Sequence, residues 1–290
     1  MTSADFRRPV AVVTDSSACL PRDEVERLRI GVAPMVLVWH GQELRDGVDI
    51  TQAEFWQRLT TDPELPTTST IAPGEYEQVL DEAAAWARAA VCVCLPRPIS
   101  TMAEAAHLAA RRIADRLPVH IVEAGGAGMA AGFPALLAAR AAAGGAAASE
   151  VVETAERAAG HSAIVAVLDS LSYLARGGRV PGIVARVADA LPSTFVLRFG
   201  DGTIGVRARF GSRARAVRGL VHHVSKEAQR ATYVGITVHH GSDEAEAHEL
   251  AAHVQRIIRP DDLFVTGFTP VMGAHVGPGL IGLAYCALPA

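Results

Sequence analysis

The stretch Val10-Ala11-Val12-Val13-Thr14-Asp15-Ser16-Ser17 indicates a buried β-strand that ends in a polar turn. Leu20 and Pro21 follow it and begin a helix that we predict to extend to Leu28, with the proline in its first turn. A second strand, Ala90–Leu95, consists only of apolar residues. Such strands are typical of a parallel sheet whose two faces are both covered by helices. This order of elements predicts an α/β fold.

The alternation of strands and helices continues along the first half of the chain and then changes. In the first half we predict strands at 10–14, 32–39, 90–95 and 119–122, and helices at 20–28, 51–59, 74–90, 101–116 and 130–143. In the second half we predict a helix at 150–159, a strand at 163–167, a helix at 169–175, a hairpin at 195–209, a helix at 212–229, a strand at 233–239, a helix at 243–257, and strands from 263 and from 280. A patch rich in Gly, Ala and Ser at 142–149 marks a soft boundary. We therefore predict two domains, a parallel-sheet α/β domain at residues 1–158 and a mixed-sheet α+β domain at residues 159–290.

Composition excludes several classes of protein. The net charge of -4 and the pI near 6.3 argue against a nucleic-acid-binding surface. The four cysteines, Cys19, Cys92, Cys94 and Cys286, show no paired spacing, so we expect reduced, buried thiols in a cytoplasmic protein. Neither Cys nor His falls at the spacing of metal ligands, and we expect no metal and no cofactor. No secretory signal and no apolar run of the ~18 residues that a membrane helix needs is visible.

Hydroxyl and carboxylate side chains follow the predicted strands of the first half. They are Asp15, Ser16, Ser17, Thr68, Ser100 and Glu123. Ligands of parallel sheets bind at the carboxyl ends of the strands, where such loops converge. Each motif alone is also what an ordinary helix cap or surface loop looks like. Ser100 precedes a helix, and a helix N-terminus with a capping hydroxyl is a favourable place for a carboxylate. Asp15 and Glu123 could instead form a paired-carboxylate acid/base site.

The final motif, Gly273-Ala274-His275-Val276-Gly277-Pro278-Gly279, follows an apolar run at 263–271 that we predict to be a strand. Gly277 and Gly279 permit backbone angles closed to other residues, so the loop can aim His275 at a ligand. An earlier motif, Leu174-Ala175-Arg176-Gly177-Gly178-Arg179, ends a helix with a glycine cap. Its second glycine and Arg179 are not needed for capping, which makes Arg179 a candidate for a functional role.

Basic residues gather between residues 207 and 218, at Arg207, Arg209, Arg213, Arg215 and Arg218. They form either a solvated face or a surface for a phosphate or an acidic partner. Two histidine pairs, His222-His223 and His239-His240, have neighbouring side chains that point in opposite directions, so we do not expect either pair to share a metal ion.

Taken in order, these motifs resemble the DegV family of bacterial fatty-acid-binding proteins, which includes the acyl-binding subunit of bacterial fatty acid kinase. The landmarks are Thr14-Asp15-Ser16-Ser17-Ala18, Pro66-Thr67-Thr68-Ser69, Ile99-Ser100, Leu174–Arg179 and His275–Gly279, and they cover essentially the whole chain.

The resemblance implies two domains, the second covering a long-chain fatty acid whose tail is buried and whose carboxyl group lies at their interface. It implies that Thr68 and Ser100 bind the carboxylate and that Arg179 and His275 form a rim for the carboxyl or phosphate group. Asp15, Ser16, Ser17, Gly277 and Gly279 would belong to the supporting loops. The partner would be the catalytic subunit of a fatty acid kinase, which makes the acyl phosphate, and the protein itself would be a non-catalytic subunit.

The chain departs from the family pattern around Ser100. Ser100-Thr101-Met102-Ala103 replaces the usual serine-glycine-threonine-tyrosine, Pro96 and Arg97 replace serines, and Glu123-Ala124 replaces Asp-Ser.

Two alternatives therefore stand beside fatty-acid binding. One is an enzyme that acts on a small carboxylated or phosphorylated substrate with Asp15 and His275. The other is a diverged regulatory member of the family that binds no ligand.

Overall fold

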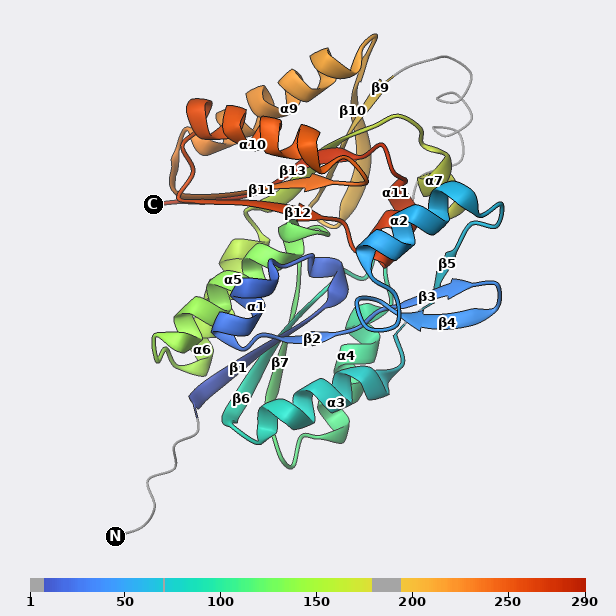
Figure 1. Ribbon diagram of the computed structural model, residues 1–290. Helices are drawn as coiled ribbons and strands as arrows, with labels where there is room; N and C mark the ends of the chain where they lie inside the picture. The colour runs from blue at the N-terminus through green and yellow to red at the C-terminus, as the bar shows by residue number, and fades with distance from the viewer. Residues whose placement is uncertain (1–7, 70, 179–193) are drawn as a thin grey trace.

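The computed structural model describes residues 8–69, 71–178 and 194–290. The chain forms an α/β structure with a parallel sheet, a mixed sheet and a small antiparallel sheet (Figure 1). This confirms the predicted α/β class with a parallel N-terminal sheet and a mixed C-terminal sheet. Arg179 lies outside the described residues. In the part of the chain that the structure describes, every helix is too short or too polar to cross a membrane.

The parallel sheet has the strand order β2-β1-β6-β7. Its strands are β1 (Arg8–Asp15), β2 (Gly31–Ala33), β6 (Ala87–Cys94) and β7 (Val119–Glu123). Helices α3 (Pro73–Ala84) and α4 (Met102–Arg112) pack on one face, and α5 (Met129–Ala143) and α6 (Ala148–Ala159) pack on the other (Figure 1). Because both faces are covered, the central strands β1 and β6 are buried along most of their length, as their apolar sequences predict.

The mixed sheet has the order β10-β9-β8-β13-β11-β12, and only its β11–β12 pair is parallel. Its strands are β8 (Ser162–Leu168), β9 (Thr194–Gly200), β10 (Thr203–Phe210), β11 (Ala231–His240), β12 (Asp262–Gly267) and β13 (Ile281–Pro289). Helices α9 (Arg213–Ala228) and α10 (Glu244–Ile257) cover its outer face (Figure 1). The predicted hairpin is confirmed, and its turn residues Asp201 and Gly202 both have the positive φ that a tight hairpin turn needs.

The predicted single strand at 32–39 is wrong. Its residues form two strands, β2 in the parallel sheet and β3 (Val36–Trp39) in a separate antiparallel sheet of order β4-β3-β5. Pro34 lies between them and has no N–H to continue a ladder. The remaining strands of this sheet are β4 (Gln42–Arg45) and β5 (Thr67–Ser69), and β5 lies where no strand was predicted.

The predicted strand at 263–271 also needs correction. Strand β12 ends at Gly267, and Pro270 begins the short helix α11 (Pro270–Val276). Proline at the first helical position loses no hydrogen bond, since its missing N–H would be unpaired there anyway. The apolar composition that suggested a strand fits this half-buried helix equally well. His275 therefore lies in the last turn of a helix, and Gly277 ends that helix with φ of 76°.

The remaining helices follow their local signals. Helix α2 (Gln52–Thr61), predicted at 51–59, begins with a capping box, in which the Thr51 and Glu54 side chains accept hydrogen bonds from each other's backbone N–H groups. The others are the short helix η1 (Ser16–Ala18), α1 (Arg22–Leu28) and α7 (Ser172–Arg176).

Helix α5 joins the two large sheets, because it contacts β1 and β6 on one side and β8 and β13 on the other. Its start is held by His239 of β11, which is fully buried. His239 Nε2 accepts a hydrogen bond of 2.8 Å from the Met129 N–H. The proton must then lie on Nδ1, which faces the Thr266 carbonyl at 3.2 Å. Burial lowers the pKa of His239 from 6.5 to about 3.

We expect stability to fall as the pH drops below 6.5. The folded pKa of His239 is depressed, so the neutral ring stabilises the fold fully above the unfolded pKa, and this contribution is lost as the pH falls toward about 3. At pH 5 the loss amounts to about 2 kcal/mol relative to pH 8. Urea unfolding at the two pH values, compared between the wild type and His239→Gln, measures it.

His161→Gln, on an exposed histidine, is the control for this experiment. An equal pH dependence in the wild type and His239→Gln would contradict the expectation.

Candidate functional site

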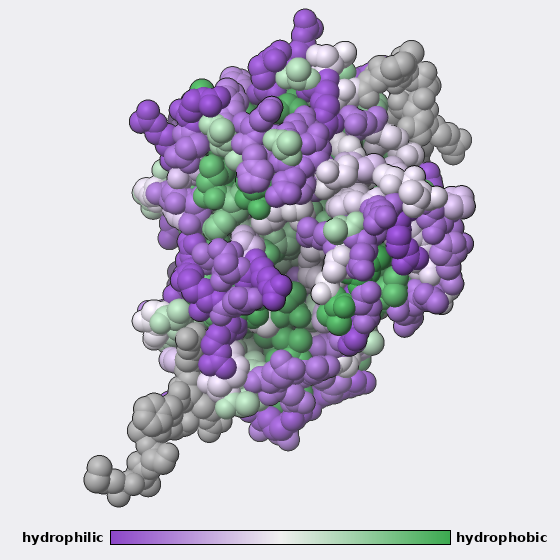
Figure 2. Space-filling view, in the orientation of Figure 1, coloured by the Kyte–Doolittle hydropathy of each residue, from purple (hydrophilic) through white to green (hydrophobic). Residues whose placement is uncertain are grey.

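A cavity of about 400 Å³ opens where elements from both halves of the chain meet. Its walls are mainly apolar and come from β8, β9, β10, α7, α11 and the loop after β6. The apolar lining includes Leu95, Ile164, Ala166, Leu168, Leu174, Leu197, Phe199, Ile204, Val271 and Met272. Most of the face seen in Figure 2 is hydrophilic, and hydrophobic residues reach the surface mainly around the middle of the molecule. An apolar space of this size with few polar groups is typical of a small-molecule site.

The polar lining of the cavity contains three of the predicted site residues, namely Thr68 on β5, Ser100 before α4 and His275 on α11. Thr68 Oγ1 and His275 Nε2 are hydrogen-bonded at 3.0 Å, although the two residues lie 207 positions apart in the sequence. Both side chains are half-buried, so their hydrogen bond is partly shielded from water. The structure thus brings these two predicted residues into direct contact.

Ser100 keeps its place at the cavity despite the altered sequence that follows it. Its Oγ accepts a hydrogen bond of 3.4 Å from the Met102 N–H, at the first turn of α4. The Met102 side chain is completely buried in the core. Met102 therefore anchors this loop by packing, where the usual family sequence has a threonine.

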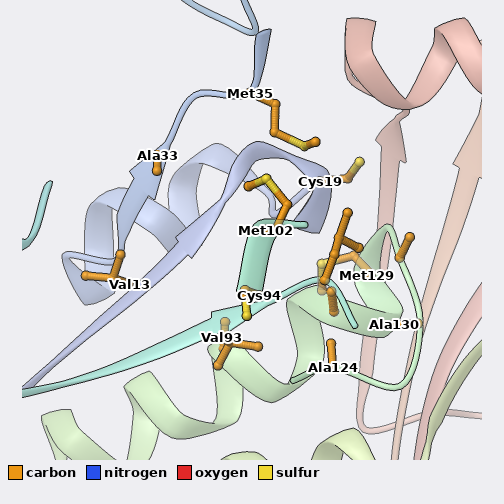
Figure 3. Packing of buried hydrophobic residues seen from close by; sticks show 14 of the residues in the cluster. Val13, Cys19, Ala33, Met35, Val93, Cys94, Met102, Ala124, Met129 and Ala130 are labelled. Atoms are coloured by element: carbon orange, nitrogen blue, oxygen red, sulfur yellow. The ribbon is translucent and has the colours of Figure 1, made fainter. Parts of the chain in front are cut away.

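Buried sulfur-containing side chains lie behind this loop. Figure 3 shows Met102 in a cluster with Met35, Met129, Cys19 and Cys94. All four cysteines of the chain are free and buried, as predicted. Burial raises the pKa of the Cys19 thiol to about 12 and raises the pKa of Cys94 further, so neither is a reactive thiolate at neutral pH.

Asp15, Ser16 and Ser17, predicted to belong to the supporting loops, do not line this cavity. The Asp15 carboxylate accepts hydrogen bonds from the Ser17 N–H, the Ser17 hydroxyl and the Tyr76 hydroxyl. Burial raises the pKa of Asp15, and the hydrogen bonds from Ser17 and Tyr76 partly offset that rise. Asp15 and Ser16 line a second cavity of about 330 Å³ instead.

The carboxylates considered as acid/base partners have separate surroundings. Glu123 pairs with Arg97 at 3.2 Å, and Asp15 binds Ser17 and Tyr76. Asp15 and His275 line different cavities. Among the described residues, no group of three or more His, Cys, Asp or Glu side chains could hold a metal ion.

Close packing explains Gly177, at the end of α7, and Gly277 and Gly279, after α11. A Cβ on Gly277 would lie 2.5 Å from the Tyr173 ring, and one on Gly279 would collide with the Asp169 carboxylate. A Cβ on Gly177 would lie 2.5 Å from His275 Nδ1. The glycine motif at the end of α7 and the histidine motif at the end of α11 are therefore packed against each other.

Arg213 reaches the same region. It donates hydrogen bonds to Asp169, to both carboxylate oxygens of Glu246 and to the Gly279 carbonyl. It is thus committed to a network around the Gly277–Gly279 loop, which neither interpretation of the arginine run predicted. The acidic partners of Arg213, Asp169 and Glu246, lie far from it in the sequence, so no local pattern pointed to them.

Sequence reasoning also missed the apolar walls. On β8, Ile164, Ala166 and Leu168 face the cavity at every second position. The residues between them are buried as well, so the alternation that marks a strand face is not visible in the sequence.

The sequence model of the DegV family, described as "Uncharacterised protein, DegV family", matches residues 9–288. A DegV domain-containing protein from Streptomyces coelicolor is 35% identical over 279 residues, which cover 95% of this chain and 98% of that relative. The chain therefore belongs to the DegV family.

Solved structures share the fold. A DegV family protein from Thermus thermophilus, reported for its fatty acid binding, has a TM-score of 0.88 and 24% identity, covering 97% of this chain and 100% of that one. A stearic acid-binding protein from Eubacterium ventriosum has a TM-score of 0.86 and 21% identity, covering 96% of this chain and 98% of that one.

Gly177→Ala should disturb His275 without straining the backbone, because Gly177 has φ of -68°. The added methyl group meets the imidazole, so we expect loss of the Thr68–His275 hydrogen bond and destabilisation by about 1 to 3 kcal/mol from overpacking. Thermal unfolding and the ring nitrogen chemical shifts of His275 measure both effects.

Gly74→Ala is the matched control, since a Cβ at Gly74 meets no atom within 4 Å. His275 shifts that stay unchanged in Gly177→Ala would contradict the expected contact.

Proposed function

We propose that the protein binds a long-chain fatty acid, with the tail in the apolar cavity and the carboxylate beside Thr68, Ser100 and His275. The observation that carries this proposal is the Thr68–His275 hydrogen bond at the polar side of an otherwise apolar cavity. The fatty acid and stearic acid binding named for the two structural relatives supports the same ligand class. The cavity walls come from both sides of residue 158, which agrees with a ligand held between domains 1–158 and 159–290.

Burial of the tail supplies the driving force. About 14 to 16 methylenes at ~0.8 kcal/mol each yield roughly 11 to 13 kcal/mol before the costs of binding are subtracted. Desolvation of a lone carboxylate costs several kcal/mol unless hydrogen bonds replace the lost water. The hydroxyls of Thr68 and Ser100 are suited to replace it, because hydrogen bonds to a charged acceptor are the stronger ones.

The Thr68–His275 pair can orient its donors toward a carboxylate. If His275 Nε2 carries the proton, it donates to Thr68 Oγ1, and the Thr68 hydroxyl hydrogen is free for the ligand. Thr68 then acts as a donor of fixed direction, and the imidazole fixes that direction. Loss of His275 would leave the hydroxyl free to rotate and would weaken the carboxylate contact.

We further propose that the bound acid is presented to the catalytic subunit of a fatty acid kinase. That partner would transfer the γ-phosphoryl group of ATP to a carboxylate oxygen, producing acyl phosphate and ADP. His275 and Arg179 would then face the more highly charged product, and this chain would perform no bond-making step itself. Half-buried rather than fully buried side chains at Thr68, Ser100 and His275 support a carboxylate that a partner can reach.

Two alternatives receive less support. An enzyme that uses Asp15 with His275 needs both groups at one substrate, yet they line different cavities. A regulatory member without a ligand would be expected to have side chains filling the cavity, whereas about 400 Å³ is open.

Ile204→Trp should block the tail and abolish binding of palmitate, because the half-buried Ile204 side chain lines the cavity.

Thr68→Val, which replaces the hydroxyl by a methyl group, should keep the tail site. It should weaken the binding of palmitate by about 1.5 to 3 kcal/mol, the range for a hydrogen bond to a charged group. Native mass spectrometry and calorimetry with palmitate measure both variants.

Val206→Trp, on the same strand but exposed and outside the cavity lining, is the matched control. Wild-type protein that carries no acyl chain after purification and fails to bind added palmitate would overturn the proposal.

A further inference from the structure

A buried carboxylate lies next to the site without facing the cavity. Asp46, in the loop after β4, is only 3% exposed. Its Oδ2 accepts a hydrogen bond of 2.7 Å from the Ser16 hydroxyl, and the same hydroxyl oxygen accepts one of 3.1 Å from the Met35 N–H. The Asp46 N–H donates to the Met35 carbonyl at 2.8 Å. Asp46 thus connects the end of β1 with Met35, which itself lines the cavity.

Thr269 and Pro270, at the start of α11, line the second cavity together with Ser16 and Asp46. The Thr269 hydroxyl and the Val271 N–H both lower the pKa of Asp46. Asp46 Oδ1 is buried and has no hydrogen-bond partner among the described residues. Thr269 Oγ1 also donates to the Ser16 carbonyl at 3.4 Å. The first turn of α11 therefore rests against the pair formed by Ser16 and Asp46.

The position of α11 matters because this helix brings one wall and one polar group to the cavity. Val271, Met272, His275 and Val276 all line it. A helix of seven residues has little stability of its own, so its position depends on what holds its two ends. Gly277 and Tyr173 pack at the last turn, and Ser16 and Asp46 at the first.

Burial disfavours the charged form of the Asp46 carboxylate. The pKa of Asp46 is raised to about 6, mainly by burial and to a smaller extent by the nearby Asp15. The other titratable groups around it are Cys19, in the turn after β1, and Arg22 of α1, which both line the second cavity beside Asp46. No described cation forms an ion pair with Asp46. The hydrogen bond from Ser16 lowers the pKa of Asp46 in part and so favours the buried carboxylate.

We propose that Asp46 is a positioning residue of the candidate site, which holds the first turn of α11 against Ser16 so that His275 reaches Thr68. Asp46 touches no ligand in this role and acts through α11. Its effect on ligand affinity rests on the proposed function, whereas its effect on the Thr68–His275 hydrogen bond does not.

The test compares Asp46→Ala with Asp49→Ala in protein without ligand. Asp49 lies in the same loop but pairs at the surface with Arg45 at 2.9 Å. The readout is the set of ring nitrogen chemical shifts of His275, with Thr68→Val as the reference for a broken hydrogen bond. We expect Asp46→Ala to move the His275 shifts to those of Thr68→Val, and Asp49→Ala to leave them at wild-type values.

Should Asp46→Ala fail to fold, Ser16→Ala carries the same test, since it deletes only the hydroxyl that donates to Asp46 Oδ2 and accepts from the Met35 N–H. Wild-type His275 shifts in a folded Asp46→Ala or Ser16→Ala variant would overturn the proposal.

Affinity for palmitate separates the two proposals. If the wild type binds palmitate, we expect at least a tenfold loss in Asp46→Ala and none in Asp49→Ala, and equal affinities would overturn the positioning role. If the wild type does not bind palmitate while Asp46→Ala still moves the His275 shifts, fatty-acid binding is wrong and the positioning role stands.

Discussion

Helix α5 packs between the parallel and the mixed sheets and sets how the two halves of the fold meet. Its start is fixed by the hydrogen bond from the Met129 N–H to the neutral ring of His239. Its other end is tied to β12 by two hydrogen bonds from Arg140 to Asp262, which also accepts one from Tyr233. Because α5 is held at both ends, it fixes the position of the two sheets relative to each other. The cavity walls that these sheets contribute are fixed with them.

The candidate site adds a second, smaller arrangement to this frame. Short elements supply its polar groups, namely the three-residue strand β5 with Thr68 and the seven-residue helix α11 with His275. Neither is stable alone, and each is held by groups outside itself, such as Ser16 and Asp46 for α11. The site therefore combines rigid apolar walls on long strands with polar groups whose positions depend on a few hydrogen bonds.

Local signals made much of the fold predictable. The capping box of Thr51 and Glu54, the hairpin at Gly200-Asp201-Gly202 and the apolar strands β1 and β6 are each encoded within a few consecutive residues. The wrong predictions fell where apolar runs were judged without their tertiary partners. Residues 32–39 divide between two sheets, and residues 263–271 change from strand to helix, because the choice depends on which strands and helices lie nearby.

For the site, local motifs in the sequence were enough to name the candidate residue types, since hydroxyls at strand ends and a histidine before Gly277-Pro278-Gly279 can be recognised within a few residues. The folded chain was needed to show that Thr68 and His275 share a hydrogen bond, that Asp15 lines another cavity, and that Asp46 accepts a hydrogen bond from Ser16. The partners in these contacts lie far apart along the chain. A contact between residues 207 positions apart leaves no periodicity or composition signal, because the packing of the whole fold creates it.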